Sequence, residues 1–521
     1  MNAPLENAPK FFRVKFTPGQ WKRVVASAEI AGILPVQFVQ RAVKFANRRV
    51  RLPLWKRLWT WIRPPAIKAP EESSPPPKVL TGDSLKCYAK FLLKSNERRN
   101  RAVALNMAYE LWASVTGDLP VKLISLPVLE EFSSRLMASG SEPYYINRTV
   151  WIVRDPMTFT HGEGVYLFDE TGKKYLDFTS GIGVMNLGYS FEAGKSAVKS
   201  QVDALAHLSN LYNNPLQEEV ADLLDQANHY KAFFANSGAE ANEAALKLAR
   251  LIKPGKEILA FEDGFHGRTF GAMSATMQDK IQNGFFPMVS GFSKAIYNDV
   301  DSLKASVTPH TGAIIFEIVQ GEGGVTPLTT EFAAALKSCQ EQGILLIVDE
   351  VQTGNGRTGK LFAFENFGFE PDIFTTAKGL GNGLPVGAML AKNCYADCFS
   401  AGKHGSTFGG NPLAMASAKA VLTELTSVDF LSEVADKADF LKRQLEERLA
   451  IKPSVKAIRN LGLMVGIQLT DGNQLQQVLS EARAQGLLVL SAGKDVVRLL
   501  PPLVMTKAQL ADGVAILEEV L

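Results

Sequence analysis

Lys378 and Asp349 are the two residues whose types and surroundings most clearly indicate chemistry. The apolar run ILLIV leads directly into Asp349, and Lys378 follows 29 positions later in the glycine-rich run AKGLGNGLP. A lysine amine can form a Schiff base with an aldehyde cofactor, and a carboxylate at the end of a strand can pair with a protonated pyridine nitrogen. The pair indicates a pyridoxal phosphate enzyme, although a lysine beside glycines is more often a solvated surface group.

A second segment, FFANSGAEANEAALKLAR, offers a place for a phosphate group. Ser237, Gly238 and Ala239 lie between an apolar run and a strongly helical stretch. Backbone N–H groups at the start of a helix attract an anion, and a glycine lets it approach closely. The same residues also fit an ordinary helix N-cap with no ligand.

Two further segments contain side chains suited to a ring and to anions. In FEDGFHGRTFGAMSAT, Phe265 could stack on a planar ring, and Arg268 could hold a carboxylate through two parallel hydrogen bonds. In HGSTFGGNP, the hydroxyls of Ser406 and Thr407 lie among glycines, and they could contact a phosphate or a substrate. A core phenylalanine, a surface arginine and a plain loop are the alternative interpretations.

These residues require elements that hold them in place. The apolar runs AIIFEIV and ILLIVDEV read as buried strands, and they alternate with helical stretches. This alternation predicts an α/β fold.

Eight segments, taken in order, resemble the class III pyridoxal phosphate-dependent aminotransferases. The chain is most similar to their acetylornithine and ornithine aminotransferase branch, from about residue 160 to residue 521. The segments are GVYLFDETGKKYLDFTSGI, SNLYNNP, FFANSGAEANEAALKLAR, FHGRT, QGEGGV, DEVQTGNGRTGKLFAFENFGFEPDI, AKGLGNGLPVGAML and STFGGNPLA. The resemblance implies a fold type I transferase, with a large domain built on a mainly parallel sheet and a small α+β domain.

The resemblance also implies roles around the cofactor ring. Lys378 would bind the pyridoxal phosphate aldehyde and, once released, act as the base that moves a proton. Asp349 would hold the ring nitrogen, Gln352 the ring hydroxyl oxygen, and Phe265 would cover one ring face.

The implied phosphate site is shared between two subunits. Ser237, Gly238 and Ala239 would bind the phosphate within one subunit, and Thr407 would reach the phosphate of its neighbour. The resemblance therefore implies a homodimer with shared active sites.

The implied substrate site contains a switch. Arg498 would grip the α-carboxylate of glutamate, and Glu322 would mask that arginine when an ω-amine without this carboxylate is bound. Arg268 would take the distal carboxylate, and Ser406 is a further candidate for substrate contact.

The chain departs from the family pattern at two places. Relatives carry a Gly-His-x-His-Pro turn where this chain has GYSFEAG, and Glu-Pro where it has Glu317–Ile318. Neither change affects the lysine chemistry, but both leave the amino acceptor unassigned.

We therefore expect an aminotransferase that moves an amino group from a donor, L-glutamate or an ω-amine, to an aldehyde or ketone by a ping-pong mechanism. An aminomutase or decarboxylase on the same scaffold is an alternative. So is a DNA-binding regulator whose enzyme-like body senses a metabolite, although intact Lys378, Asp349 and Arg268 argue against it.

Composition is consistent with a large cytoplasmic enzyme. Hydrophobic residues make up 46% of the chain, and no apolar run approaches the ~20 residues of a membrane span. The four cysteines are too few for a disulfide framework, and the six histidines show no metal-ligand spacing. We expect no metal site.

Charge divides the chain into unlike parts. Residues 1–70 contain 14 Lys and Arg but only two acidic residues, whereas the remainder is net acidic. PPAIKAPEESSPPPK reads as an extended linker. The predicted parts are a basic module (1–63), the linker (64–78), a helical subdomain (79–142) and the aminotransferase domain (143–521), with its large domain at about 195–410 and its small domain from 143–194 plus 411–521.

Three interpretations of the basic module stay open. The alternation in FRVKF, followed by two helical patterns, resembles a ribbon-helix-helix module in which Arg13 and Lys15 would face DNA. The run RLPLWKRLWTWIR is typical of a segment lying on a membrane surface. An arm that packs on the enzyme or on a partner protein is the third possibility.

Overall fold

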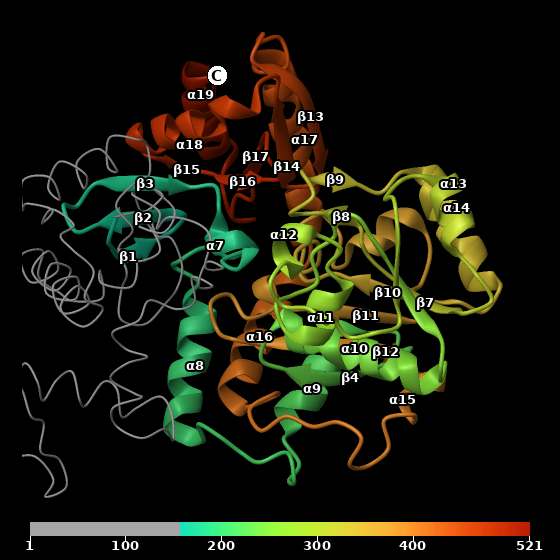
Figure 1. Ribbon diagram of the computed structural model, residues 1–521. Coiled ribbons are helices and arrows are strands. Elements are labelled where there is room, and N and C mark those ends of the chain that lie inside the picture. The colour runs from blue at the N-terminus through green and yellow to red at the C-terminus, as the bar shows by residue number, and fades with distance from the viewer. Residues whose placement is uncertain (1–156) are drawn as a thin grey trace, which may run out of the picture. The chain divides into compact units, whose positions relative to one another are not determined.

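The computed structural model describes residues 157–521 (Figure 1). The predicted basic module, linker and helical subdomain lie outside the described residues, as does the start of the predicted aminotransferase domain. Among residues 157–521, none of the helices has the length and apolar character needed to span a membrane.

A seven-stranded sheet forms the centre of the described chain. Strands β11, β10, β7, β5 and β6 are parallel to one another, and β12 runs antiparallel to both β4 and β11. The prediction of a mainly parallel α/β sheet is confirmed. In spatial order the strands are β4 (Tyr230–Ala235), β12 (Gly387–Lys392), β11 (Ile373–Thr376), β10 (Leu345–Asp349), β7 (Thr311–Glu317), β5 (Glu257–Phe261) and β6 (Phe292–Ala295).

Helices cover both faces of this sheet, which explains why its strands are apolar throughout. Because side chains alternate across a strand, Ile314 and Phe316 face one helical layer, and Ala313 and Ile315 face the other. The first layer comprises α9 (Pro215–Leu224), α14 (Thr330–Glu341) and α16 (Pro412–Leu425), and the second is mainly α10 (Gly238–Ile252).

Helix α10 has mostly small side chains on its buried face, so it can lie close to the sheet. Its buried stripe is largely alanine, and Ser237 caps its first turn by accepting a hydrogen bond from the Glu240 N–H at 3.2 Å. The predicted strand–turn–helix at this segment is confirmed.

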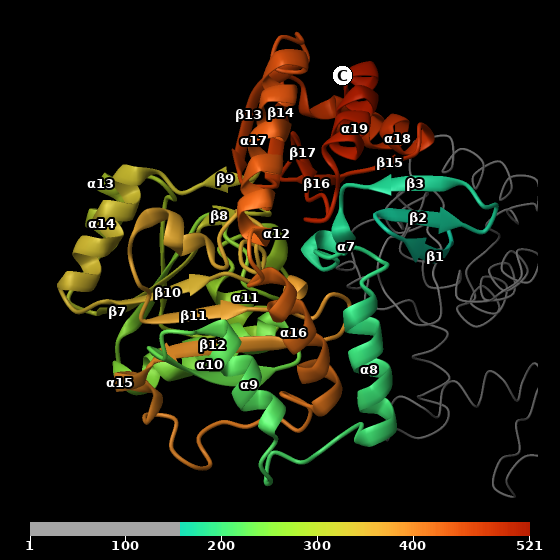
Figure 2. The same cartoon turned by 180° about the vertical axis from the view of Figure 1, so that it is seen from behind.

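Two smaller sheets come from the ends of the described chain, and Figures 1 and 2 show them beside one another. They share a core with the C-terminal helices. The first contains β1 (Phe159–Glu163), β2 (Tyr166–Asp169), β3 (Lys174–Asp177) and β15 (Leu487–Leu488); the second contains β13 (Val455–Leu461), β14 (Met464–Leu469), β17 (Val496–Leu499) and β16 (Leu490–Ala492). The helices around them are α17 (Phe430–Arg448), α18 (Leu475–Ala484) and α19 (Lys507–Val520).

The remaining helices, strands and 3-10 turns complete the described chain. They are α7 (Ser180–Gly183), α8 (Glu192–Ala204), α11 (Phe270–Ala275), α12 (Asp279–Gln282), α13 (Val300–Ser306), α15 (Asn393–Ala396), the hairpin strands β8 (Val319–Gln320) and β9 (Thr326–Pro327), and the 3-10 turns η1 (Ala363–Phe367), η2 (Lys378–Leu380) and η3 (Gly472–Gln474).

Arg357 connects the central sheet to both ends of the described chain. Its fully buried guanidinium donates to the carbonyls of Leu463 and Pro501 and to Asn186 Oδ1. Burial lowers the pKa of Arg357 to about 9. Because carbonyl oxygens, and not a carboxylate, surround this charge, it fixes backbone segments in place.

Candidate active site

Lys378 lies where β11 ends and η2 begins. Its φ of +45° is in the left-handed region, which costs a non-glycine residue roughly 1–2 kcal/mol. Asn355 holds the two residues that precede Lys378, because its side-chain amide donates to Thr376 Oγ1 and to the Ala377 carbonyl. Backbone strain of this kind persists only where surrounding contacts impose it, and it is often found at functional sites.

The pKa of the Lys378 amine is lowered toward neutral pH. Burial, aided by the nearby Arg498 charge, lowers the pKa of Lys378 to about 8, and Asp349, Glu317 and Glu322 oppose this shift. Within residues 157–521 its Nζ atom makes no hydrogen bond. The lone pair of the neutral amine is therefore available for bond formation or for accepting a proton.

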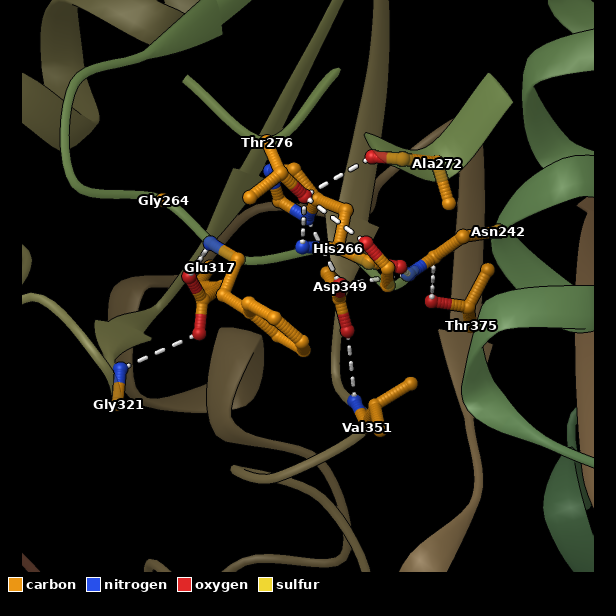
Figure 3. Close-up of polar contacts among 12 residues, drawn as sticks. Asn242, Gly264, His266, Ala272, Thr276, Glu317, Gly321, Asp349, Val351 and Thr375 are labelled. Atoms are coloured by element: carbon orange, nitrogen blue, oxygen red, sulfur yellow. Dashed lines mark hydrogen bonds and ion pairs between the residues drawn. The ribbon is translucent and has the colours of Figure 1, made fainter. Parts of the chain in front are cut away.

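Asp349 ends β10 and is held at both of its oxygens (Figure 3). Oδ2 accepts from the Asn242 amide and pairs with His266 Nδ1, each at 2.8 Å, and Oδ1 accepts from the Val351 N–H at 3.0 Å. The Thr375 hydroxyl in turn donates to Asn242 Oδ1 at 2.7 Å. This network fixes the direction of a buried carboxylate, as a group that holds a ring nitrogen requires.

A second buried carboxylate, Glu317, ends the adjacent strand β7 in register with Asp349. Its two oxygens accept the backbone N–H groups of Phe265 at 2.9 Å and Gly321 at 3.2 Å. Burial raises the pKa of Glu317 to about 7, with the charge of His266 opposing the shift and that of Asp349 adding to it.

Two other segments of the site approach the start of α10 closely, and we call this helix start the phosphate cradle. A Cβ atom on Gly238 would lie 2.6 Å from the Val351 side chain, and one on Gly267 would lie 2.7 Å from that of Ala239. Only glycine permits these approaches, so the FHGRT segment and the Asp349 loop can both lie against the helix start. The N–H groups of the first helical turn lack intrahelical acceptors, and they are suited to an anion.

Arg498 on β17 meets Glu322, as the resemblance implies. The Arg498 Nη1 donates to Glu322 Oε1 at 2.8 Å, to the Gly321 carbonyl at 3.0 Å and to Gln352 Oε1 at 3.3 Å. Arg498 is 3% exposed, whereas the Glu322 side chain is 35% exposed and can move. The Arg498 Nε is buried without a partner among the described residues, which leaves a donor for a carboxylate.

Phe265 and Arg268 lie together at the edge of this cluster. Phe265 is half-buried, and the exposed Arg268 guanidinium carbon lies 5.6 Å from the centre of its ring. This cation–π contact holds the arginine beside the aromatic face.

Ser406 and Thr407 belong to a separate loop. Ser406 Oγ accepts from Gly409 N–H and from the Asn236 amide, so it closes its own turn. Thr407 is exposed, and within the described chain no hydrogen bond joins it to the α10 start. The structure therefore brings together Lys378, Asp349, Gln352, Glu322 and Arg498, and it joins the Ser406 loop to Asn236, the residue before Ser237.

Sequence reasoning missed His266, Asn242 and the contacts of Glu317. His266 was within a quoted segment, and Asn242 lies one helical turn after Gly238 on the buried face of α10. That position was the available signal, because a buried polar residue needs a partner. Among residues 157–521 no cluster of potential metal ligands exists.

A family model described as aminotransferase class-III matches residues 150–521. The chain belongs to the class III aminotransferases. Its cofactor is accordingly pyridoxal phosphate, and its enzyme class is that of the aminotransferases.

Curated relatives and solved structures agree with this family. The chain is 66% identical over 369 residues to acetylornithine aminotransferase of Lactococcus lactis subsp. lactis, which covers 71% of this chain and 98% of that protein. The N-acetylornithine aminotransferase structure from Stenotrophomonas maltophilia has a TM-score of 0.62 and 32% identity, covering 70% of this chain and 96% of its own.

A more distant structure adds the cofactor. The Toxoplasma gondii ornithine aminotransferase, described with partial occupancy of PLP at its active site, has a TM-score of 0.68 and 28% identity. It covers 79% of this class III aminotransferase and 97% of its own chain.

The described residues fit pyridoxal phosphate. The start of α10 offers N–H donors to the phosphate, Asp349 offers a fixed carboxylate to the ring nitrogen, and Lys378 offers an amine with no competing hydrogen bond. The predicted family, fold class and cofactor are confirmed.

Proposed function

We propose that this class III aminotransferase moves an amino group between glutamate and an ω-amino acid of the acetylornithine type, in two half-reactions of a ping-pong mechanism. The observation that carries this proposal is the ion pair between Arg498 and Glu322 beside Gln352 and Lys378. The acetylornithine assignment of a relative at 66% identity supports the substrate class.

Lys378 and Asp349 divide the proton chemistry. Pyridoxal phosphate, when bound, supplies an aldehyde for the amino group and a ring that accepts electrons. Lys378 accepts and returns a proton at Nζ, because its lowered pKa leaves much of the amine neutral near pH 8. Asp349, oriented by Asn242 and His266, keeps the ring nitrogen protonated.

The Arg498–Glu322 pair separates the two substrates by charge. Glutamate brings an α-carboxylate, which takes the place of Glu322 on Arg498 and displaces that partly exposed side chain. An ω-amine presents no carboxylate at this point, so Glu322 stays on Arg498 and neutralises it. The exposed Arg268, which lies beside Phe265, receives the distal carboxylate, and Ser406 is a further candidate for substrate contact.

A homodimer completes the phosphate site. Thr407 is followed by Phe408, which is 60% exposed, and the neighbouring Leu211 and Tyr212 are 87% and 68% exposed. Asn210 ties the two segments by donating to the Ser406 and Gly409 carbonyls. A second copy that buries these apolar side chains would receive Thr407 at its own cradle.

The absorbance of the purified protein with pyridoxal phosphate, before and after L-glutamate, tests the proposal. We expect a visible band that bleaches as 2-oxoglutarate forms, and N-acetylornithine should bleach the same band. The Lys378→Ala variant should lose this band and all turnover but keep its fold. Release of carbon dioxide, or an isomerised product without 2-oxoglutarate, would instead establish the decarboxylase or aminomutase alternative.

A further inference from the structure

We propose that Glu317 is a positioning residue that couples the Phe265 segment to the Gly321 turn, so that the ring-covering face and the Arg498–Glu322 pair are set by one carboxylate. This inference deepens the proposed function and rests on it for the roles of Phe265 and Arg498.

The carboxylate contacts one segment with each oxygen (Figure 3). Oε1 accepts from the Phe265 N–H, and Oε2 accepts from the Gly321 N–H. Phe265 is next to His266, which holds Asp349, and the Gly321 carbonyl accepts from Arg498. One carboxylate therefore fixes the position of both segments.

The backbone of Glu317 is itself fixed. It pairs with β10 at Asp349, and the buried Tyr297 hydroxyl donates to its carbonyl at 2.7 Å and to that of Ile318 at 3.2 Å. The side chain thus extends from a rigid strand end to two loops. A rigid support of this kind is what a site needs if its contacts are to hold a fixed geometry.

The burial of Glu317 means that a negative charge at this position loses its contact with water, which costs free energy. Glu317 is 6% exposed, and among residues 157–521 no Lys or Arg bonds to it. The charged groups of this part of the chain that act on it are His266, Asp349 and Lys378. An apolar or amide side chain would avoid the desolvation of a negative charge. A carboxylate, by contrast, gives each of the two N–H donors its own acceptor oxygen.

Hydrogen–deuterium exchange of the full-length protein without cofactor tests the coupling directly. In Glu317→Ala we expect the amides of Phe265 and Gly321 to exchange at least about ten-fold faster, equivalent to about 1.4 kcal/mol. Glu317→Gln retains a single acceptor oxygen, so it should release one of the two amides and retain the other.

Asp372→Ala is the matched control. Asp372 is also a buried carboxylate that accepts a backbone N–H, that of Leu346, but it lies at the opposite end of β10. This variant should speed exchange at Leu346 and leave Phe265 and Gly321 unchanged. Exchange that rises at only one of the two segments in Glu317→Ala, or equally in both variants, would overturn the proposal.

Kinetics of the cofactor-loaded protein give the second readout. Both Glu317 variants should raise the Kd for pyridoxal phosphate and the KM for glutamate together, whereas Asp372→Ala should change neither. An absent visible band in the wild-type protein would defeat the proposed function, yet the exchange experiment would still decide whether Glu317 couples the two segments.

Discussion

At the scale of single residues, the site depends on charges held in fixed directions. The Asp349 carboxylate has three hydrogen-bond partners, and the Glu317 carboxylate has two. Arg498 bonds to its partners through Nη1 alone among the described residues. Lys378 stands among these groups without a hydrogen bond in the described chain. The buried carboxylates are therefore anchored, whereas Glu322, which pairs with Arg498, is 35% exposed.

Removing the Glu322 carboxylate should shift the preference between substrates. In Glu322→Ala, Arg498 stays unmasked, so we expect a lower KM for glutamate and a higher KM for N-acetylornithine, whose carboxylate lies away from its reacting ω-amino group. Steady-state kinetics with both substrates measures this change. The exposed Glu331→Ala in α14 is the control, and equal effects on both substrates would contradict the switch.

The sequence indicated Lys378 and Asp349 as candidate reactive residues, but it did not indicate the residues that support them. Lys378 and Asp349 were visible because a strand end and a glycine turn mark them. His266 and Asn242 were not assigned, because hydrogen-bond partners on separate elements depend on how those elements pack. The pairing of Glu322 with Arg498 came from the resemblance alone, since 176 positions separate them.

At the scale of elements, the carboxyl ends of β7 and β10 create the site. AIIFEIV and ILLIVDEV were predicted as strands, and they form β7 and β10 with Glu317 and Asp349 in register. The antiparallel direction of β12 could not be predicted, because a fully buried strand is apolar whichever way it runs. The left-handed turn Ser180–Gly183 also escaped prediction, since only two of its four residues are glycines.

The residue after β10 should make stability depend on pH. Burial raises the pKa of Glu350 from 4.5 to about 7, where Thr353 and the Phe364 N–H are its partners. Between these values the folded state keeps a proton that the unfolded state releases. The contribution favours folding at low pH, and it is lost as pH rises through 7, by up to about 3 kcal/mol.

Melting temperatures of the wild type and Glu350→Gln from pH 5 to pH 8 measure this effect. We expect the advantage of the wild type to shrink steadily with rising pH, because glutamine does not titrate. Glu331→Gln, which changes an exposed glutamate, should show a constant difference. A constant difference for Glu350→Gln as well would mean that the folded protein holds this carboxylate charged throughout.

At the scale of the whole molecule, the catalytic part and the basic part are separable in the sequence. The family match begins at residue 150, and the matched Lactococcus enzyme is covered over 98% of its own length. The predicted division at residues 63, 78 and 142 rests on composition and charge, and it stays a prediction.

Deletion of residues 1–142 should therefore leave transamination unchanged. We expect the same kcat/KM for glutamate in the shortened and full-length proteins, because every residue of the described site follows residue 156. Loss of activity on deletion would show that the basic part supports the enzyme. Salt-dependent binding of DNA by the full-length protein, absent from the shortened one, would favour the nucleic-acid interpretation.

The parallel pairing of β3 with β15 also determines when the first small sheet can be completed during synthesis. Leu176 finds its partner at Leu487, close to the end of the chain. A ribosome needs on the order of tens of seconds to translate the intervening residues. During that time the early strands have no partner on one edge, so nascent chains should engage holding chaperones until the last helix has emerged.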